Sequence, residues 1–194
     1  MRCIYCDRSI DRIGIRDLLI KEDILCIDCR KELGFKKKYI SLNNMKIETF
    51  YEYDSLFKTM LLQYKECYDE ALKDVFLYRL NEYIFFRYYG YEIVLIPSSK
   101  KKLQERGFNH LRLIFENVGL KINEGLLMKE DLIQEGKSAI ERKSMIHNYF
   151  YAGNSIKKAL IVDDIITTGS SITGAYNALK GHCDHIKVLV LARR

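Results

Sequence analysis

Tryptophan is missing from the 194-residue chain, and proline occurs only once. With 48% hydrophobic and 30% charged residues, the composition excludes a collagen-like, low-complexity or intrinsically disordered chain. No stretch approaches the roughly 20 consecutive apolar residues that a membrane-spanning helix needs. The N-terminus also lacks the basic, apolar and small-residue regions of a signal peptide. We therefore expect a cytoplasmic protein with one full globular domain and a small additional module.

The positive charge of the chain is concentrated in short clusters. The formal net charge is +6, and the clusters include residues 36–38 and 100–102, each a run of three lysines. Any one of them is compatible with a solvated surface. The alternative is polyanion binding, either of nucleic acid or of a multiply phosphorylated small molecule. Charge alone does not distinguish these alternatives.

Four of the six cysteines form two C-x-x-C pairs, Cys3 with Cys6 and Cys26 with Cys29, which are separated by 19 residues. This spacing is typical of a zinc site with four cysteine ligands, because each pair can turn two sulfurs onto one metal. Two disulfides are disfavoured in a reducing cytoplasm, and four incidental thiols are not expected to show this spacing. An all-cysteine site is closed, so we expect a structural Zn²⁺ in a zinc-ribbon-like module.

Beyond the cysteines, the apolar pattern predicts an α/β domain. We expect the zinc-binding module over residues 1–33, a linker over 34–44 and the larger domain over 45–194. Since strands and helices alternate, the fold class is α/β, with a mainly parallel, doubly wound sheet. The polar, basic segment 97–107 is expected to be a loop. The expected strands are 45–53, 91–96, 158–162 and 186–192, and the expected helices are 54–65, 69–89, 108–118 and 171–180.

The segment 159–173 has the most informative pattern. A buried strand ends in Asp163 and Asp164, and a hydroxyl-rich turn leads into a helix. Because ligands of open α/β sheets bind at the carboxyl ends of strands, both acids are expected to project into a site. Adjacent carboxylates suit a ribose diol, and a turn of amides and hydroxyls at a helix start suits a phosphate monoester. The simpler alternative is an acidic strand end followed by a serine helix cap. The turn comprises Ile165, Ile166, Thr167, Thr168, Gly169, Ser170 and Ser171.

These residues resemble a known family. The sequence from Val162 to Ser171 looks like the phosphoribosyl pyrophosphate motif of type I phosphoribosyltransferases. The sequence from Ile96 to His110, which contains Arg-Gly-Phe-Asn, resembles a segment of ComF-type competence proteins. That family also has an N-terminal four-cysteine zinc module. A further series resembles it as well: Gln134, Lys137, Arg142, Asn148 and Phe150.

The resemblance implies a site for phosphoribosyl pyrophosphate with Mg²⁺. Asp163 and Asp164 would bind the ribose hydroxyls and the associated metal and would carry any catalysis, while residues 165–171 would wrap the 5-phosphate. Cations and Mg²⁺ suit a pyrophosphate group. A mobile loop over 131–144 would bring Lys137 and Arg142 to the site, and Arg106 is a further candidate. The pyrophosphate would be held by Ser98, Ser99, Lys100, Lys101 and Lys102.

One departure from the superfamily affects the expected activity. In the enzymes that salvage 6-oxopurines, an Asp near the base nitrogen occupies the position of Thr167, and a threonine cannot accept a proton there at neutral pH. The resemblance therefore favours a competence protein that supports uptake of transforming DNA, with single-stranded DNA or a DNA-processing partner such as a competence helicase. An active phosphoribosyltransferase and a module that senses phosphoribosyl pyrophosphate are the alternatives.

Overall fold

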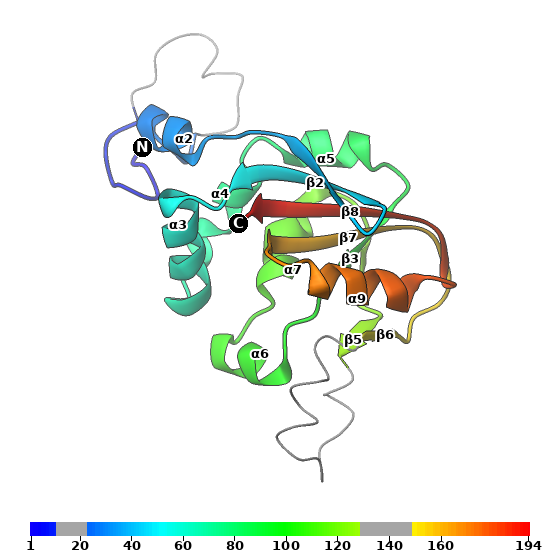
Figure 1. The fold of residues 1–194 in the computed structure, drawn as a ribbon. Helices are drawn as coiled ribbons and strands as arrows, with labels where there is room; N and C mark the ends of the chain where they lie inside the picture. Colours follow the sequence, from blue (N-terminus) through cyan, green and yellow to red (C-terminus); the bar gives the residue numbers. More distant parts are fainter. Residues whose placement is uncertain (11–22, 129–148) are drawn as a thin grey trace.

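The computed structural model describes residues 1–10, 23–128 and 149–194, and its centre is a six-stranded sheet (Figure 1). The strand order is β1-β2-β8-β7-β3-β4. Only the β1–β2 pair is antiparallel, and the other four pairs are parallel, so the expected mainly parallel α/β sheet is confirmed. The strands are β1 (Lys38–Leu42), β2 (Met45–Glu52), β3 (Glu92–Leu95), β4 (Ile122–Asn123), β7 (Ile156–Ile166) and β8 (Cys183–Arg193).

Short helices surround this sheet. Within the described ranges, no helix combines the length and the apolar character needed to cross a membrane. A second, two-stranded sheet of β5 (Leu126–Met128) and β6 (Tyr149–Tyr151) packs beside α9. The helices are α2 (Ile27–Leu33), α3 (Ser55–Glu66), α4 (Lys73–Phe76), α5 (Asn81–Arg87), α6 (Lys100–Arg106), α7 (His110–Phe115) and α9 (Ser170–Leu179), with 3₁₀ turns at Glu70–Leu72 and Glu116–Val118.

The central strand β7 lies between β8 and β3 and is covered on both faces. Its segment 159–162 has no exposed surface, which explains the unbroken apolar run of a parallel strand buried on two sides. Successive side chains of a strand point to opposite faces. One face packs against α9, and α7 approaches β7 from the other face, where its His110 side chain meets Asp164. Residues 163 and 164 therefore belong to different layers of the molecule.

The sheet has a topological switch point between β3 and β7. The chain leaves β7 through α9 and returns at β8, whereas it leaves β3 through α6 and α7 and returns at β4, on the other side. The two strands are parallel, and β3 ends opposite Val162 of β7, where the Ile96 amide donates to the Val162 carbonyl at 3.2 Å. Because connections diverge from this point, it is the place where open α/β sheets bind ligands.

Three expectations of secondary structure were wrong. The helix expected over 69–89 is broken between α4 and α5, where Arg79 has a φ of +59°. The basic segment expected as a loop contains α6, and the linker over 34–44 contains β1, an edge strand of the main sheet. In the first case a tertiary contact overrides the helical pattern, because Tyr78 and Arg79 both bind Asp23 of the N-terminal module.

The N-terminal segment that carries the four cysteines packs directly on the α/β fold. Figure 1 places α2 and the N-terminus near α3 and α4, and α2 contacts α3. Leu25, Cys26 and Cys29 are buried in the same apolar cluster as the core of the larger domain. The N-terminal segment therefore shares one core with the α/β fold and is also joined to it through Asp23.

Candidate functional site

A small hollow lies at the carboxyl end of β7, where the strand leads into α9. It is lined by Asp163 and by residues 165–172. Thr167 and Thr168 are exposed in the turn, and the Thr168 hydroxyl lies 3.1 Å from that of Ser170, the first residue of α9. Amides and hydroxyls at the positive end of a helix favour an anion, so this turn suits a phosphate monoester.

Gly169 is required in this turn. Its φ of +73° lies in the left-handed region, which other residues adopt only with strain. A Cβ atom at this position would also collide with Leu42, from the β1–β2 hairpin. Asn43 of the same hairpin donates a hydrogen bond of 3.3 Å to Thr173 of α9. The hairpin therefore supports the turn, although the sequence predicted only a linker there.

The two acids of the strand face different surroundings. Asp163 is half-buried and lines the hollow, while Asp164 is 5% exposed and points into the opposite layer. There its Oδ2 lies 2.7 Å from Nε2 of His110 and also forms an ion pair with the Lys65 ammonium. The structure thus brings Asp163 together with the turn, and it places Asp164 with two basic residues from α3 and α7.

These surroundings shift the pKa values of the two acids in opposite directions. Burial and the neighbouring charge of Asp164 raise the pKa of Asp163 to about 8. Burial also opposes ionisation of Asp164, but the Lys65 charge and the His110 hydrogen bond outweigh it and hold the pKa of Asp164 well below its usual range. Asp164 is therefore a firmly ionised member of a buried ion pair, whereas ionisation of Asp163 depends on a further cation.

His110 connects Asp164 to a second basic residue. Burial lowers the pKa of His110, so the imidazole is neutral and carries a single N–H. The contact with ionised Asp164 requires that proton on Nε2, which leaves Nδ1 to accept from Arg106 at 3.5 Å. Arg106 also donates to Glu66 of α3 at 3.1 Å. One chain of contacts thus runs from α3 through Arg106 and His110 to β7.

The Arg-Gly-Phe-Asn sequence builds the turn that makes this chain of contacts. Arg106 ends α6, and Gly107 follows with the left-handed φ of +76° that stops the helix. Phe108 packs on Tyr64 with ring centroids 5.5 Å apart. Asn109 then caps α7 by accepting from the Arg112 amide at 3.2 Å. Each residue of the motif therefore has a structural role in the turn between α6 and α7, and together the four residues bring Arg106 beside His110.

The expected pyrophosphate residues follow β3 at the same edge of the sheet. Ser98 and Ser99 are half-buried, and the Ser99 hydroxyl accepts from the Lys102 amide at 3.4 Å and so caps α6. The three lysines are exposed on the first turn of that helix. Figure 1 shows α6 lying away from the sheet, below α7. Lys137 and Arg142, with the whole loop 131–144, lie outside the described residues.

Sequence reasoning missed three residues of this region: Lys65, Glu66 and His110. His110 directly follows the Arg-Gly-Phe-Asn motif, so its position was a usable signal. Lys65 and Glu66 end an amphipathic helix and look like ordinary surface residues in the sequence. Only the tertiary fold, which places the end of α3 near β7, brings Lys65 to Asp164.

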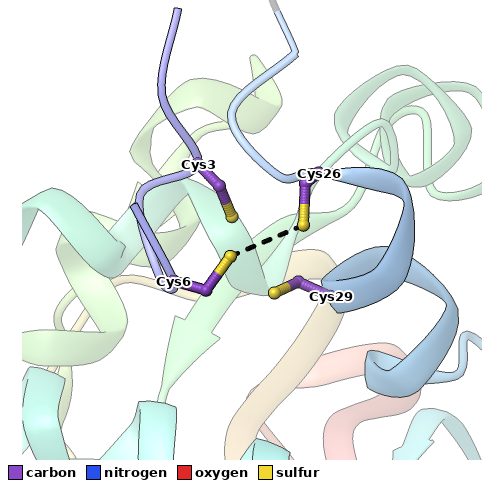
Figure 2. A group of neighbouring side chains, drawn as sticks. All are labelled: Cys3, Cys6, Cys26 and Cys29. Atoms are coloured by element: carbon purple, nitrogen blue, oxygen red, sulfur yellow. Dashed lines mark hydrogen bonds between the residues drawn. The ribbon is translucent and has the colours of Figure 1, made fainter. Parts of the chain in front are cut away.

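The four cysteines of the C-x-x-C pairs converge on one point at the N-terminus (Figure 2). Their Sγ atoms all lie within 4.8 Å of one another, and those of Cys6 and Cys26 are 3.6 Å apart. Sulfurs about 2.3 Å from a central zinc lie roughly 3.8 Å from each other at the corners of a tetrahedron. The spacing of the sulfurs therefore fits a tetrahedral metal site.

Local structure accounts for this convergence. The Asp7 amide donates to the Cys3 carbonyl at 2.9 Å and closes a tight turn around the first pair, while Cys26 immediately precedes α2. Burial and the adjacent sulfurs raise the pKa of Cys29, because several thiolates cannot share this volume without a cation. The chemistry of the donors and their spacing are thus consistent with a zinc site.

Comparisons with known proteins place the chain in a family. The fold and the cysteine cluster define a mostly parallel α/β protein with an N-terminal four-cysteine site. No family model matches the sequence. Over 181 residues it is 30% identical to Competence protein ComFC of Streptococcus pneumoniae, and the match covers 88% of this chain and 77% of that protein. The chain therefore belongs to the ComFC family of competence proteins.

Proposed function

We propose that this chain binds phosphoribosyl pyrophosphate with Mg²⁺ in the crevice between β3 and β7 and supports DNA uptake as a competence protein. The observation that carries the proposal is the hollow at the carboxyl end of β7, where Asp163 adjoins the turn 165–171. A ribose diol next to a 5-phosphate requires a charged acceptor beside an anion-binding turn. Asp163 and the turn supply these two groups.

The pyrophosphate would extend toward the carboxyl end of β3. Residues 98–102 follow that strand, which pairs in parallel with β7. The serines offer hydroxyls and the lysines offer positive charge. Mg²⁺ would be held by Asp163 together with ligand oxygens, and it would neutralise charge on the pyrophosphate.

The competence role rests on the family. Its relative in Streptococcus pneumoniae is named a competence protein. The exposed lysines at 100–102 would contact the phosphates of single-stranded DNA, or a DNA-processing partner such as a competence helicase would bring the DNA to the protein. The four cysteines would hold one Zn²⁺, which is structural because all four tetrahedral positions come from the protein.

The test is a calorimetric titration of the full chain with phosphoribosyl pyrophosphate in the presence of Mg²⁺. The native protein should bind, and Asp163→Asn should lose the binding because a neutral amide no longer attracts the metal. Asp184→Asn is a matched control, since Asp184 is exposed near the start of β8, far along the strand from the hollow. Equal binding by native protein and Asp163→Asn would refute the proposal.

A further inference from the structure

Asp164 is held by basic side chains from two separate helices. Lys65 lies at the end of α3 and His110 at the start of α7, and both contact the same carboxylate oxygen, Oδ2. The side chains of Lys65, His110 and Asp164 are 16%, 6% and 8% exposed, respectively. A buried carboxylate is stable only where such partners compensate the loss of water. Neither contact uses Oδ1.

The partners of Asp164 are themselves fixed in place. Arg106 lies between His110 and Glu66, at 3.5 Å and 3.1 Å. The Tyr64 hydroxyl donates to the His110 carbonyl at 2.8 Å. Since Tyr64, Lys65 and Glu66 are consecutive in α3, a single helical turn contacts the His110 carbonyl, Asp164 and Arg106. Asp164 thus stands at the end of a continuous polar network that joins three helices to β7.

We infer that Lys65 and His110 are positioning residues of the proposed ligand site, which fix Asp164 through Oδ2 and leave Asp163 as the acid that faces the hollow. The inference rests on the proposed function. Lys65 also sets the formal charge of the acidic pair. When both acids are ionised, Asp163, Asp164 and Lys65 together carry −1, and without Lys65 the two acids would carry −2, which repels a polyanionic ligand more strongly.

The test compares two lysines of α3 by calorimetric titration with phosphoribosyl pyrophosphate and Mg²⁺. Lys65→Met keeps the length of the side chain but removes its charge, and Lys58→Met makes the same change at an exposed position of the same helix. We expect Lys65→Met to weaken binding at least about tenfold, as for loss of one partner of a buried charge pair, and Lys58→Met to change it less than about twofold. Lys65→Arg should restore most of the affinity.

A double variant separates positioning from general destabilisation. If Lys65 acts through Asp164, Lys65→Met should add no further loss of affinity in an Asp164→Asn background, because the interaction has already been removed. Independent, additive losses would contradict the inference. Where Lys65→Met does not fold, Lys65→Gln replaces it, since its amide keeps a donor for Asp164 without the charge.

The outcomes distinguish this inference from the proposed function. If the native protein does not bind the ligand at all, the proposed function itself is wrong. If the native protein binds and Lys65→Met or Lys65→Gln binds within about twofold of it, the function stands and Lys65 has no positioning role. Equal weakening by Lys65→Met and Lys58→Met would also overturn the inference, because it would reveal only a loss of net positive charge.

Discussion

Neutralising the two adjacent acids one at a time should change stability in opposite directions. Asp164 forms a buried ion pair with Lys65 and lies 2.7 Å from His110, so Asp164→Asn leaves the ammonium without a compensating charge. Asp163 has no basic partner of this kind among the described contacts, and its Oδ1 accepts only from the Asp164 amide at 2.9 Å. An asparagine oxygen can accept that same hydrogen bond.

The magnitude follows from the burial of the pair. Removing one member of a buried ion pair costs about 3–5 kcal/mol, and because Lys65 is 16% exposed and can turn toward water, we expect about 3 kcal/mol for Asp164→Asn. In a chain of this size that corresponds to a fall in Tm of roughly 9 °C. Asp163→Asn should leave the free energy of unfolding unchanged or raise it, because it removes a carboxylate that burial and Asp164 disfavour.

The assay is urea unfolding of both variants without ligand, followed by circular dichroism. The midpoint should fall for Asp164→Asn and stay or rise for Asp163→Asn, with unchanged m-values. Free energies of unfolding of the two variants within about 0.5 kcal/mol of each other would refute the reasoning, since that is the ordinary range for surface substitutions. The two acids would then share one environment, as a simple acidic strand end would.

Three further predictions concern the four cysteines, the titration of Asp163 and the lysine run at 100–102. Metal analysis of the purified protein should find one Zn²⁺ per chain, and Cys26→Ser should lower that content. Chelation of the metal should lower the Tm of the whole chain, because Leu25 and Cys26 are buried in the common core. The pKa of Asp163 is raised to about 8, so its own contribution to native stability should decline as pH rises from about 4 to 8, because the unfolded chain loses this proton first. The gain in Tm from Asp163→Asn, measured against native protein at the same pH, should therefore be larger at pH 8 than at pH 5. Replacing Lys100, Lys101 and Lys102 by Glu should weaken the binding of both phosphoribosyl pyrophosphate and single-stranded DNA. In fluorescence titrations, the logarithm of the DNA affinity of native protein should fall by roughly 0.7 per neutralised phosphate for each log unit of salt.

The layout of the fold could be predicted from local sequence patterns. The buried run 159–162, the helix after Gly169 and the two C-x-x-C pairs carry signals that depend on near neighbours in the chain. Because these signals are local, the four-cysteine cluster and the mainly parallel sheet could be predicted from the sequence. The break between α4 and α5 could not be predicted, because it depends on Asp23, more than 50 residues away.

The surroundings of Asp163 and Asp164 could not be predicted either, because they depend on residues far away in the sequence. A strand end with two acids predicts carboxylates at one edge of the sheet, but their orientation follows from the pleat, which sends Asp163 and Asp164 to opposite faces. The partners of Asp164 come from α3 and α7, at sequence separations of 99 and 54 residues. Strand β1, whose Leu42 contacts Gly169, was similarly missed, because its strand signal is short and lies in a lysine-rich segment, whereas β2 was expected.

A structure of the protein with phosphoribosyl pyrophosphate and Mg²⁺ tests the central claim most directly. We expect the 5-phosphate within hydrogen-bonding distance of the amides and hydroxyls of 165–171, the ribose beside Asp163, and Asp164 still paired with Lys65 and His110. The space beside the anomeric carbon would then show whether a planar base or an open basic groove adjoins the ligand. A ligand bound elsewhere, with the hollow at the end of β7 empty, would contradict the account.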